Sequence, residues 1–153
     1  MGQHNASDPV HPRPDQSTQS LRTRVLLADD DAEMRALLRV SLRAEGYEVL
    51  ECRDGMQLLA QLNPVYPLPV PQRFDLVITD MRMPGVSGLD LLRRLHGQSG
   101  VPPIILITAF GDAQTHTQAR QLGATAIIDK PFEMIHLLTV VRAVLALSIH
   151  QTQ

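Results

Sequence analysis

Four apolar segments of the sequence end in side chains that could take part in chemistry. Three aspartates, residues 29–31, follow the run VLLA, and Asp80 follows the run LVIT. Thr108 ends the run IILIT, and Lys130 follows the run AIID. Apolar runs without polar alternation are typical of parallel strands that are covered on both faces. Because ligands of parallel α/β sheets bind beyond the carboxyl ends of the strands, we expect these side chains to share one crevice.

Carboxylates gathered in one place repel one another, so Asp29, Asp30 and Asp80 need a cation nearby to stay ionised together. Mg²⁺ is the expected metal because it takes oxygen ligands and keeps waters and phosphate oxygens bound. Lys130 is the only lysine in a chain with 14 basic residues, and its ammonium group suits a phosphoryl oxygen. Thr108 could donate a hydrogen bond to another phosphoryl oxygen. The set predicts phosphoryl transfer to Asp80, whose carboxylate needs no base because it carries no proton at neutral pH.

These segments and their neighbours resemble the receiver domains of bacterial two-component response regulators. The matching runs, in the family's order and spacing, are VLLADDD (25–31), LVITDMRMPGVSG (76–88), ILITAFGD (105–112) and AIIDKPF (126–132). The resemblance covers residues 23–148. It implies an α/β fold of the flavodoxin-like, doubly wound (βα)5 type, with a five-stranded parallel sheet of order 2-1-3-4-5.

The resemblance also implies roles for residues around the predicted metal. Asp80 would be the phosphoryl acceptor and also a ligand of Mg²⁺. Asp30 would bind Mg²⁺ directly and Asp29 largely through water. The backbone carbonyl of Arg82, two residues after Asp80, would complete the protein ligands.

A second group of residues would respond to the phosphoryl group. Thr108 and Lys130 would contact it, and the small side chain of Ala109 would leave room for it to enter. The bond between Lys130 and Pro131 is expected to be cis. The family often has an aromatic residue three positions before the lysine, and its ring moves inward behind the threonine. This sequence has Ile127 there, which leaves that part of the switch in doubt.

The intervening sequence predicts five strand–helix units in strict alternation, which implies right-handed crossovers. The expected strands are 25–28, 48–52, 74–79, 104–107 and 126–128. The expected helices are 32–45, 55–63, 87–96, 112–122 and 132–148. Asp31, Asp54 and Asp112 are placed to cap the starts of helices, and Gly46 and Gly123 to end them. Asp129 is expected to be a solvated strand end.

The remaining sequence sets limits on organisation and location. Residues 1–22 are polar and rich in proline, which predicts a disordered tail, and 149–153 are expected to be a short C-terminal tail. Four prolines in 63–73 predict a stiff, extended connection. A single cysteine, a net charge of −2 and no apolar run of membrane-spanning length favour a cytoplasmic protein without a direct nucleic-acid or membrane partner.

The last predicted helix is apolar around most of its circumference. Its polar residues form one narrow stripe of Glu133, His136, Thr139 and Arg142. Such a helix is either a core helix of high apolar content or one that buries a second face, and we expect a homodimer through this helix. The candidate contact residues are Ile135, Leu138, Val141 and Leu145. The fourth helix, in contrast, is poor in apolar residues, which predicts loose packing.

The predicted function is that of a receiver, standing alone or excised from a longer protein, with a histidine kinase or phosphotransfer protein as phosphoryl donor. It would not be an enzyme beyond its own phosphorylation and dephosphorylation. One alternative is a phosphohydrolase of the haloacid-dehalogenase class, but those enzymes need a second carboxylate where this sequence has Arg82. A flavin-binding protein is disfavoured because the loop after the first strand is acidic. A receiver-like module that binds proteins without phosphorylation stays open because of Ile127.

Overall fold

The computed structural model describes residues 22–63, 73–109 and 112–151, and strands and helices alternate along them. The strands are β1 (Arg24–Ala28), β2 (Glu48–Cys52), β3 (Leu76–Asp80), β4 (Ile104–Thr108) and β5 (Ala126–Asp129). The helices are α1 (Ala32–Ala44), α2 (Gly55–Leu62), α3 (Gly88–Leu95), α4 (Ala113–Gln121) and α5 (Met134–His150). The predictions of a disordered segment over 1–22 and of a stiff connection over 63–73 lie almost wholly outside the described residues.

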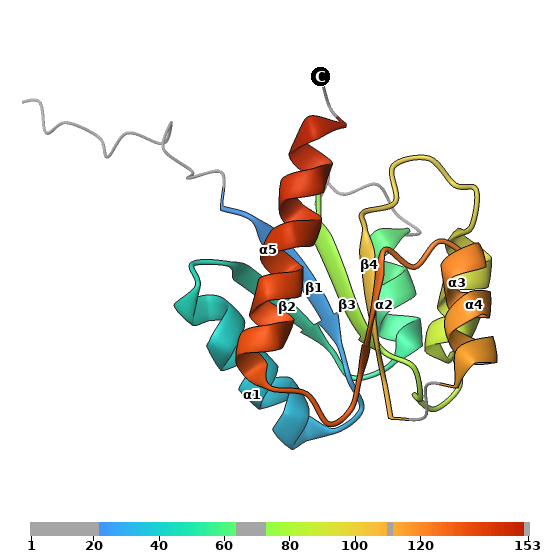
Figure 1. Cartoon of the computed structure of the whole chain (residues 1–153), viewed down its shortest axis with the longest axis horizontal. Coiled ribbons are helices and arrows are strands. Elements are labelled where there is room, and N and C mark those ends of the chain that lie inside the picture. Colours follow the sequence, from blue (N-terminus) through green and yellow to red (C-terminus); the bar gives the residue numbers. More distant parts are fainter. Residues whose placement is uncertain (1–21, 64–72, 110–111, 152–153) are drawn as a thin grey trace, which may run out of the picture.

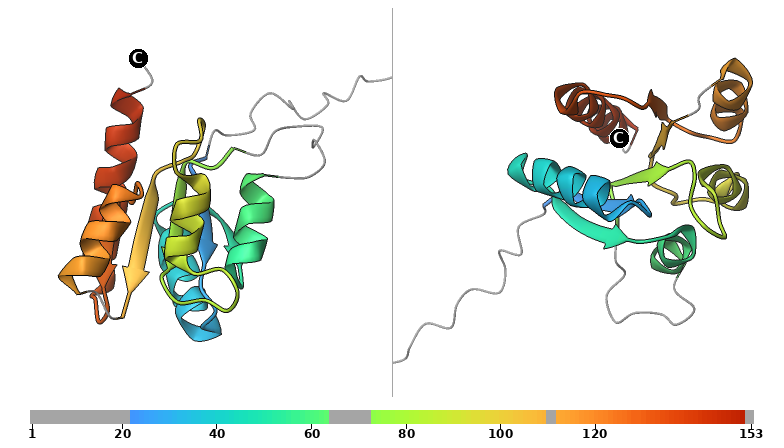
Figure 2. Two further views of the ribbon diagram at one scale, coloured as in Figure 1. Left: turned by 90° about the vertical axis from the view of Figure 1, so that its right-hand side faces the viewer. Right: turned by 90° about the horizontal axis from the view of Figure 1, so that it is seen from below.

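The five strands form one parallel sheet in the order β2-β1-β3-β4-β5, as the resemblance implied. Helices cover both faces of this sheet (Figures 1 and 2). One core lies between the sheet and α2, α3 and α4, and it contains Leu58, Leu92 and Ala119. The other lies between the sheet and α1 and α5, and it contains Leu42 and Val141. The inner strands β1, β3 and β4 are apolar along most of their length because both of their faces are buried.

Several element boundaries differ from the sequence expectation by a few residues. Strand β3 begins at Leu76 instead of residue 74, since the side chain of Asp75 turns aside to accept a hydrogen bond from the Arg24 backbone N–H. Helix α5 begins at Met134 and continues to His150, so the first two residues of the expected C-terminal tail are helical. No glycine or proline interrupts this stretch, and nothing in the local sequence ends the helix earlier.

The expected helix caps are confirmed. Asp31 accepts hydrogen bonds from two backbone N–H groups in the first turn of α1, Asp54 accepts one from Gln57, and Asp112 accepts one from Thr115. The glycines that follow α1 and α4 both have a positive φ, the conformation that helix-ending glycines adopt. These aspartates therefore have structural roles and are separate from the acids of the crevice.

The predicted properties of the last two helices are partly confirmed and partly wrong. The polar stripe of α5 is exposed, as expected. Val141, however, is fully buried, because it lies on the face of α5 that packs against the sheet, so it cannot be a dimer contact. Leu138 and Leu145 are half-buried beside the same core, whereas Ile135 is 69% exposed. In α4 only Ala119 is buried, in agreement with loose packing.

Gly88 allows the start of α3 to approach the carboxyl end of β3 closely. Its backbone N–H donates a 2.7 Å hydrogen bond to the carbonyl of Met81. A Cβ atom at this position would lie 2.5 Å from Cδ1 of Leu106, 2.9 Å from the carbonyl oxygen of Asp80 and 3.0 Å from Cα of Met81. Two of these three atoms belong to the backbone, so they cannot move aside without displacing Asp80.

We expect the substitution Gly88→Ala to lower the free energy of unfolding by about 1–3 kcal/mol, as overpacking of a core does. Without the close contacts, the same change within a helix would raise that free energy by about 0.5–1 kcal/mol. Urea denaturation of the two proteins measures the difference. An unchanged or increased stability would show that α3 and β3 are less tightly packed than described.

Candidate functional site

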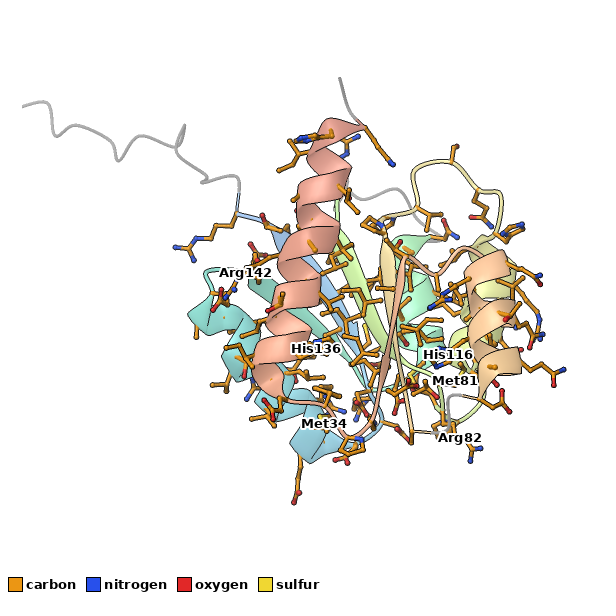
Figure 3. All side chains as sticks on the ribbon, in the orientation of Figure 1. Met34, Met81, Arg82, His116, His136 and Arg142 are labelled. Carbon is orange, nitrogen blue, oxygen red and sulfur yellow. The ribbon has the colours of Figure 1, made fainter. Side chains whose placement is uncertain are left out.

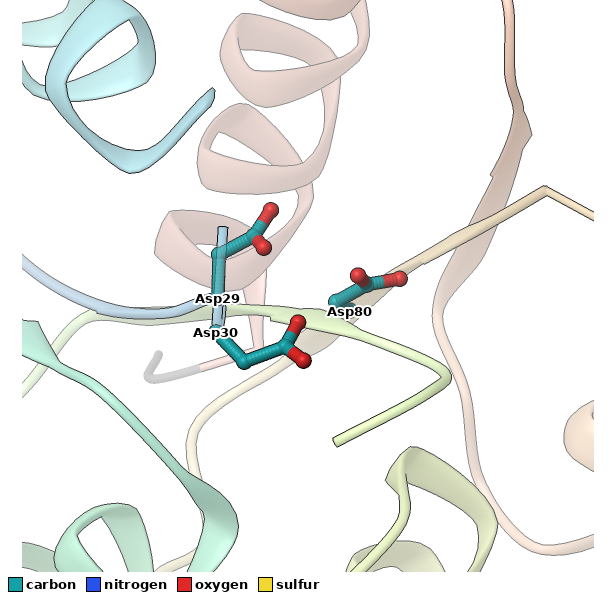
Figure 4. Close-up of side chains that lie close together, drawn as sticks. All are labelled: Asp29, Asp30 and Asp80. Atoms are coloured by element: carbon teal, nitrogen blue, oxygen red, sulfur yellow. The ribbon is translucent and has the colours of Figure 1, made fainter. Parts of the chain in front are cut away.

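Carboxylates from two strands meet at one edge of the sheet. Asp29 and Asp30 follow β1 directly, and Asp80 is the last residue of β3. These strands are neighbours in the sheet, and one carboxylate oxygen of each residue lies within 4.8 Å of the others (Figure 4). Asp29 and Asp80 are buried, with 1% and 7% of their surfaces exposed, while Asp30 is exposed. The crevice therefore opens to solvent on the side of Asp30.

Asp29 is held firmly and presents one unpartnered oxygen. Its backbone N–H donates to the carbonyl of Cys52, and its own carbonyl accepts a 2.7 Å hydrogen bond from the Arg35 guanidinium. One carboxylate oxygen accepts from the Asp31 N–H at 2.9 Å. The other oxygen, Oδ2, is buried and has no hydrogen-bond partner within the described part of the chain. Such an oxygen is costly unless a ligand binds it.

The electrostatics of the crevice agree with this geometry. Burial raises the pKa of the Asp29 carboxyl to about 6, and repulsion from the neighbouring Asp80 carboxylate adds to the rise. The hydrogen bond from the Asp31 backbone N–H and, to a smaller extent, the Lys130 ammonium group lower this pKa and so partly offset both effects. Three carboxylate oxygens within reach of one point, one of them buried and unpartnered, are a donor set that suits a hard divalent cation.

Lys130 supplies the positive charge that contacts the acids. Its Nζ lies 3.3 Å from Oδ2 of Asp80. Its backbone N–H donates a 2.7 Å hydrogen bond to the carbonyl of Thr108, which ties the ends of β4 and β5 together. The following peptide bond, to Pro131, is cis. Lys130 thus reaches Asp80 from the end of β5, which is the second strand along from β3 in the sheet.

The other predicted site residues lie around this centre. Thr108 is buried at the end of β4, and Ala109, directly after it, is exposed. Arg82 lies two residues beyond Asp80 with an exposed side chain, and the role of its backbone carbonyl stays a prediction (Figure 3). Ile127 is half-buried and packs into the core on the α3 and α4 side of the sheet.

One interaction near the site was not anticipated. Asp129, which was expected to be a solvated strand end, lies 2.8 Å from the Nε2 atom of His116 on α4. The residues are 13 positions apart. Asp129 belongs to the run AIIDKPF, but none of the matching runs includes His116. Only the packing of α4 against β5 brings them together, so no sequence signal could have identified the pair.

Among the described residues, no helix is long and apolar enough to cross a membrane.

Comparisons with known proteins relate this chain to one family. The chain matches the response regulator receiver domain family over residues 25–142. It is 40% identical over 124 residues to the C4-dicarboxylate transport transcriptional regulatory protein DctD of Pseudomonas aeruginosa, covering 81% of this chain and 25% of DctD. It is 36% identical over 124 residues to the DNA-binding response regulator MtrA of Mycobacterium tuberculosis, covering 81% of this chain and 51% of MtrA. The chain thus spans about half the length of one relative and a quarter of the other.

Solved structures show the same architecture. A CheY-like response regulator receiver domain protein from Methanospirillum hungatei superposes with a TM-score of 0.75 at 25% identity, over 85% of this chain and 98% of that one. The chemotaxis response regulator CheY4 of Vibrio cholerae gives a TM-score of 0.70 at 29% identity, over 80% of this chain and 98% of that one.

We expect Lys130→Met to lower the free energy of unfolding by about 1–3 kcal/mol in metal-free buffer, because it leaves buried Asp80 without its cation. The matched control is Arg142→Met, which removes an exposed pair with Glu45 at 2.7 Å and should cost about 0–1 kcal/mol. The two losses should differ because the acids differ in burial: the Asp80 side chain is 9% exposed, and the Glu45 side chain is 30% exposed. Equal losses in urea denaturation would contradict the assignment of Lys130 as the main counter-charge.

Proposed function

Because the chain belongs to the response regulator receiver domain family, we propose that it takes a phosphoryl group onto Asp80 from a histidine kinase or a phosphotransfer protein. One observation carries the proposal. A buried carboxylate at a strand end lies 3.3 Å from an ammonium group and shares its crevice with two further carboxylates. A structural ion pair needs only one acid, and gathering three requires a ligand of high positive charge.

The transfer would proceed by direct attack of the Asp80 carboxylate on phosphorus. A bond forms between Oδ of Asp80 and phosphorus, and the bond between phosphorus and the donor imidazole nitrogen breaks. The imidazole, with a proton on its other ring nitrogen, leaves with the electron pair of that bond and is then a neutral ring. Because a carboxylate nucleophile has no proton to remove, the chain has to supply only position and charge.

Mg²⁺ is the metal that we propose for the crevice, and it would supply the positive charge that phosphoryl oxygens need. Asp30 and Asp80 would bind it directly, Asp29 largely through water, and the backbone carbonyl of Arg82 would complete the protein ligands. The unpartnered Oδ2 of Asp29 supports this arrangement because a metal-bound water would satisfy it.

The remaining residues would hold the transferred group. Lys130 would exchange its contact with Asp80 for a phosphoryl oxygen, and the Thr108 hydroxyl would donate to another. Exposed Ala109 beside Thr108 leaves the entrance open. These roles act on a group bound to the chain itself, so we propose self-phosphorylation and autodephosphorylation and no separate substrate. The alternative of a module that signals without phosphate is supported by Ile127, which has no ring to move.

Incubation with a small phosphodonor such as acetyl phosphate, followed by intact-mass measurement, tests the proposal. The wild-type chain should gain one phosphoryl group in the presence of Mg²⁺, and EDTA should prevent the gain. Asp80→Asn should gain none, and Asp30→Asn should gain it at least tenfold more slowly at equal Mg²⁺, since one lost ligand or second-shell partner typically costs 10–100-fold. Asp112→Asn, which changes a helix-capping acid outside the crevice, is the control.

An adduct of equal yield on Asp80→Asn would place the phosphoryl group elsewhere. A wild-type chain that gains no group, although it is folded, would favour the module that binds its partners without phosphorylation.

We also propose that α5 forms a homodimer. Its surface away from the sheet carries exposed apolar residues, with Ile135 and Ile149 exposed by 69% and 68% and with exposed Ala143 and Ala146 between them, beside the polar Thr139. Arg142 also lies on this surface, where it pairs with Glu45, the residue that follows α1. A twofold dimer pairs such a surface with itself, and small alanine side chains let two helices approach closely.

Sedimentation at several concentrations tests this assembly. Ala146→Glu places a charge on the α5 surface that faces away from the sheet, so it should give a monomer. Ala60→Glu changes an exposed alanine of α2 and should leave the dimer intact. A phosphate mimic should shift the dimer affinity by about 1–3 kcal/mol. A wild-type chain that stays monomeric at high concentration, with and without the mimic, would show that α5 is only a core helix of high apolar content.

A further inference from the structure

Helix α4 has few apolar contacts with the rest of the molecule. Ala119 is its only buried residue, and it lies in the second half of the helix. In the first half, Ala113, Gln114 and Thr117 are exposed, and the half-buried residues are polar. Apolar packing therefore fixes the C-terminal half of α4 on the sheet and contributes little to the N-terminal half.

The N-terminal half is attached instead by one polar contact. Nε2 of His116 lies 2.8 Å from Oδ1 of Asp129, the last residue of β5. The His116 side chain is only 21% exposed, and Figure 3 shows it on the side of α4 that faces the sheet. Because an ionised carboxylate only accepts hydrogen bonds, Nε2 must carry the proton. Within the described residues, no other side-chain hydrogen bond joins α4 to β5.

Asp129, the strand residue of this contact, is a direct neighbour of two residues of the proposed phosphoryl site. Asp129 is paired with Thr108 across the β4–β5 ladder, and the next residue, Lys130, contacts Asp80. Only three residues separate Thr108 from Asp112, which caps α4. A displacement of Thr108 or Lys130 would therefore act directly on Asp129, which is the neighbour of Thr108 across the ladder and of Lys130 along the chain.

Ile127 lies on the same face of β5, two residues before Asp129. It has no polar atom, so it cannot hydrogen-bond to α4, and it packs into the core. The polar contact between strand and helix is thus made by a different pair of residues.

We propose that the His116–Asp129 contact is a latch that holds the N-terminal half of α4 on β5 in the unphosphorylated chain and opens when a phosphoryl group on Asp80 draws Thr108 and Lys130 inward. This inference rests on the proposed function. The latch stabilises the resting position of α4, so it opposes phosphorylation by the free energy of the contact. Removing it makes the phosphorylated arrangement easier to reach, since a ligand shifts an equilibrium by its differential affinity for the two states.

The test uses three histidine variants of the whole chain. His116→Gln keeps a nitrogen donor near the position of Nε2, whereas His116→Asn is too short to reach Asp129. His136→Asn makes the same change at an exposed histidine of α5 and is the control. Two quantities are measured for each: amide hydrogen exchange over residues 113–121 in the free chain, and the affinity for beryllium fluoride with Mg²⁺, which stands in for a phosphoryl group on a carboxylate.

In His116→Asn, exchange in the first half of α4 should quicken about fivefold, as the loss of a typical hydrogen bond predicts. Beryllium fluoride should bind more tightly by a similar factor. His116→Gln should restore both quantities toward the wild-type values, and His136→Asn should change neither.

Unchanged exchange in His116→Asn would show that the contact does not restrain α4. Faster exchange with an unchanged or weaker affinity for beryllium fluoride would show that the contact is a static tie, and either result overturns the latch. A wild-type chain that binds no beryllium fluoride would overturn the proposed function itself, and the exchange measurement would still report separately whether the contact restrains α4.

Discussion

Repulsion among three carboxylates at one edge of the sheet is the constraint on which the arrangement of this molecule depends. Two of them, Asp29 and Asp80, are buried, and the pKa of Asp29 is raised accordingly. A fold tolerates such a cluster only if its backbone cannot relax to separate the charges. Here the backbone is held by the central strands, by the Arg35 guanidinium on the Asp29 carbonyl, and by the close approach of Gly88 to β3.

The parallel topology explains why the opposing charge comes from Lys130. In the order β2-β1-β3-β4-β5, the acids end the adjacent strands β1 and β3, and Thr108 and Lys130 follow on the other side of β3. The carboxyl ends of all these strands lie at one edge, so acid and base converge from opposite sides on Asp80. The same edge carries the starts of α1 and α3, whose caps use Asp31 and a Ser87–Asp90 capping box. Asp31 and Asp90 thereby serve as helix caps and are not members of the carboxylate cluster.

The two helices beside β5 differ in how they are held. Helix α5 buries Leu137, Val141 and Val144 along its length, and it also carries exposed Ile135 and Ile149 on the solvent side beside its polar stripe. Helix α4 has one buried residue and depends on a polar contact at its start. A polar contact between two side chains can open without exposing apolar surface, whereas a buried stripe of three large residues cannot. Opening the contact that holds the start of α4 therefore costs less than separating the buried residues of α5 from the sheet would.

Much of this could be predicted from local sequence. Apolar runs of strand length, separated by helical segments with capping aspartates, determined the fold class, and a reactive residue at four strand ends determined which side chains could share a crevice. These are local properties, because burial on both faces and helix capping each impose a pattern on neighbouring residues. The burial of Val141 and the contact between His116 and Asp129 were decided only by the tertiary structure. Each depends on which face of an element meets which neighbour, and an apolar residue or a histidine has the same local pattern whether the packed helix turns it inward or outward.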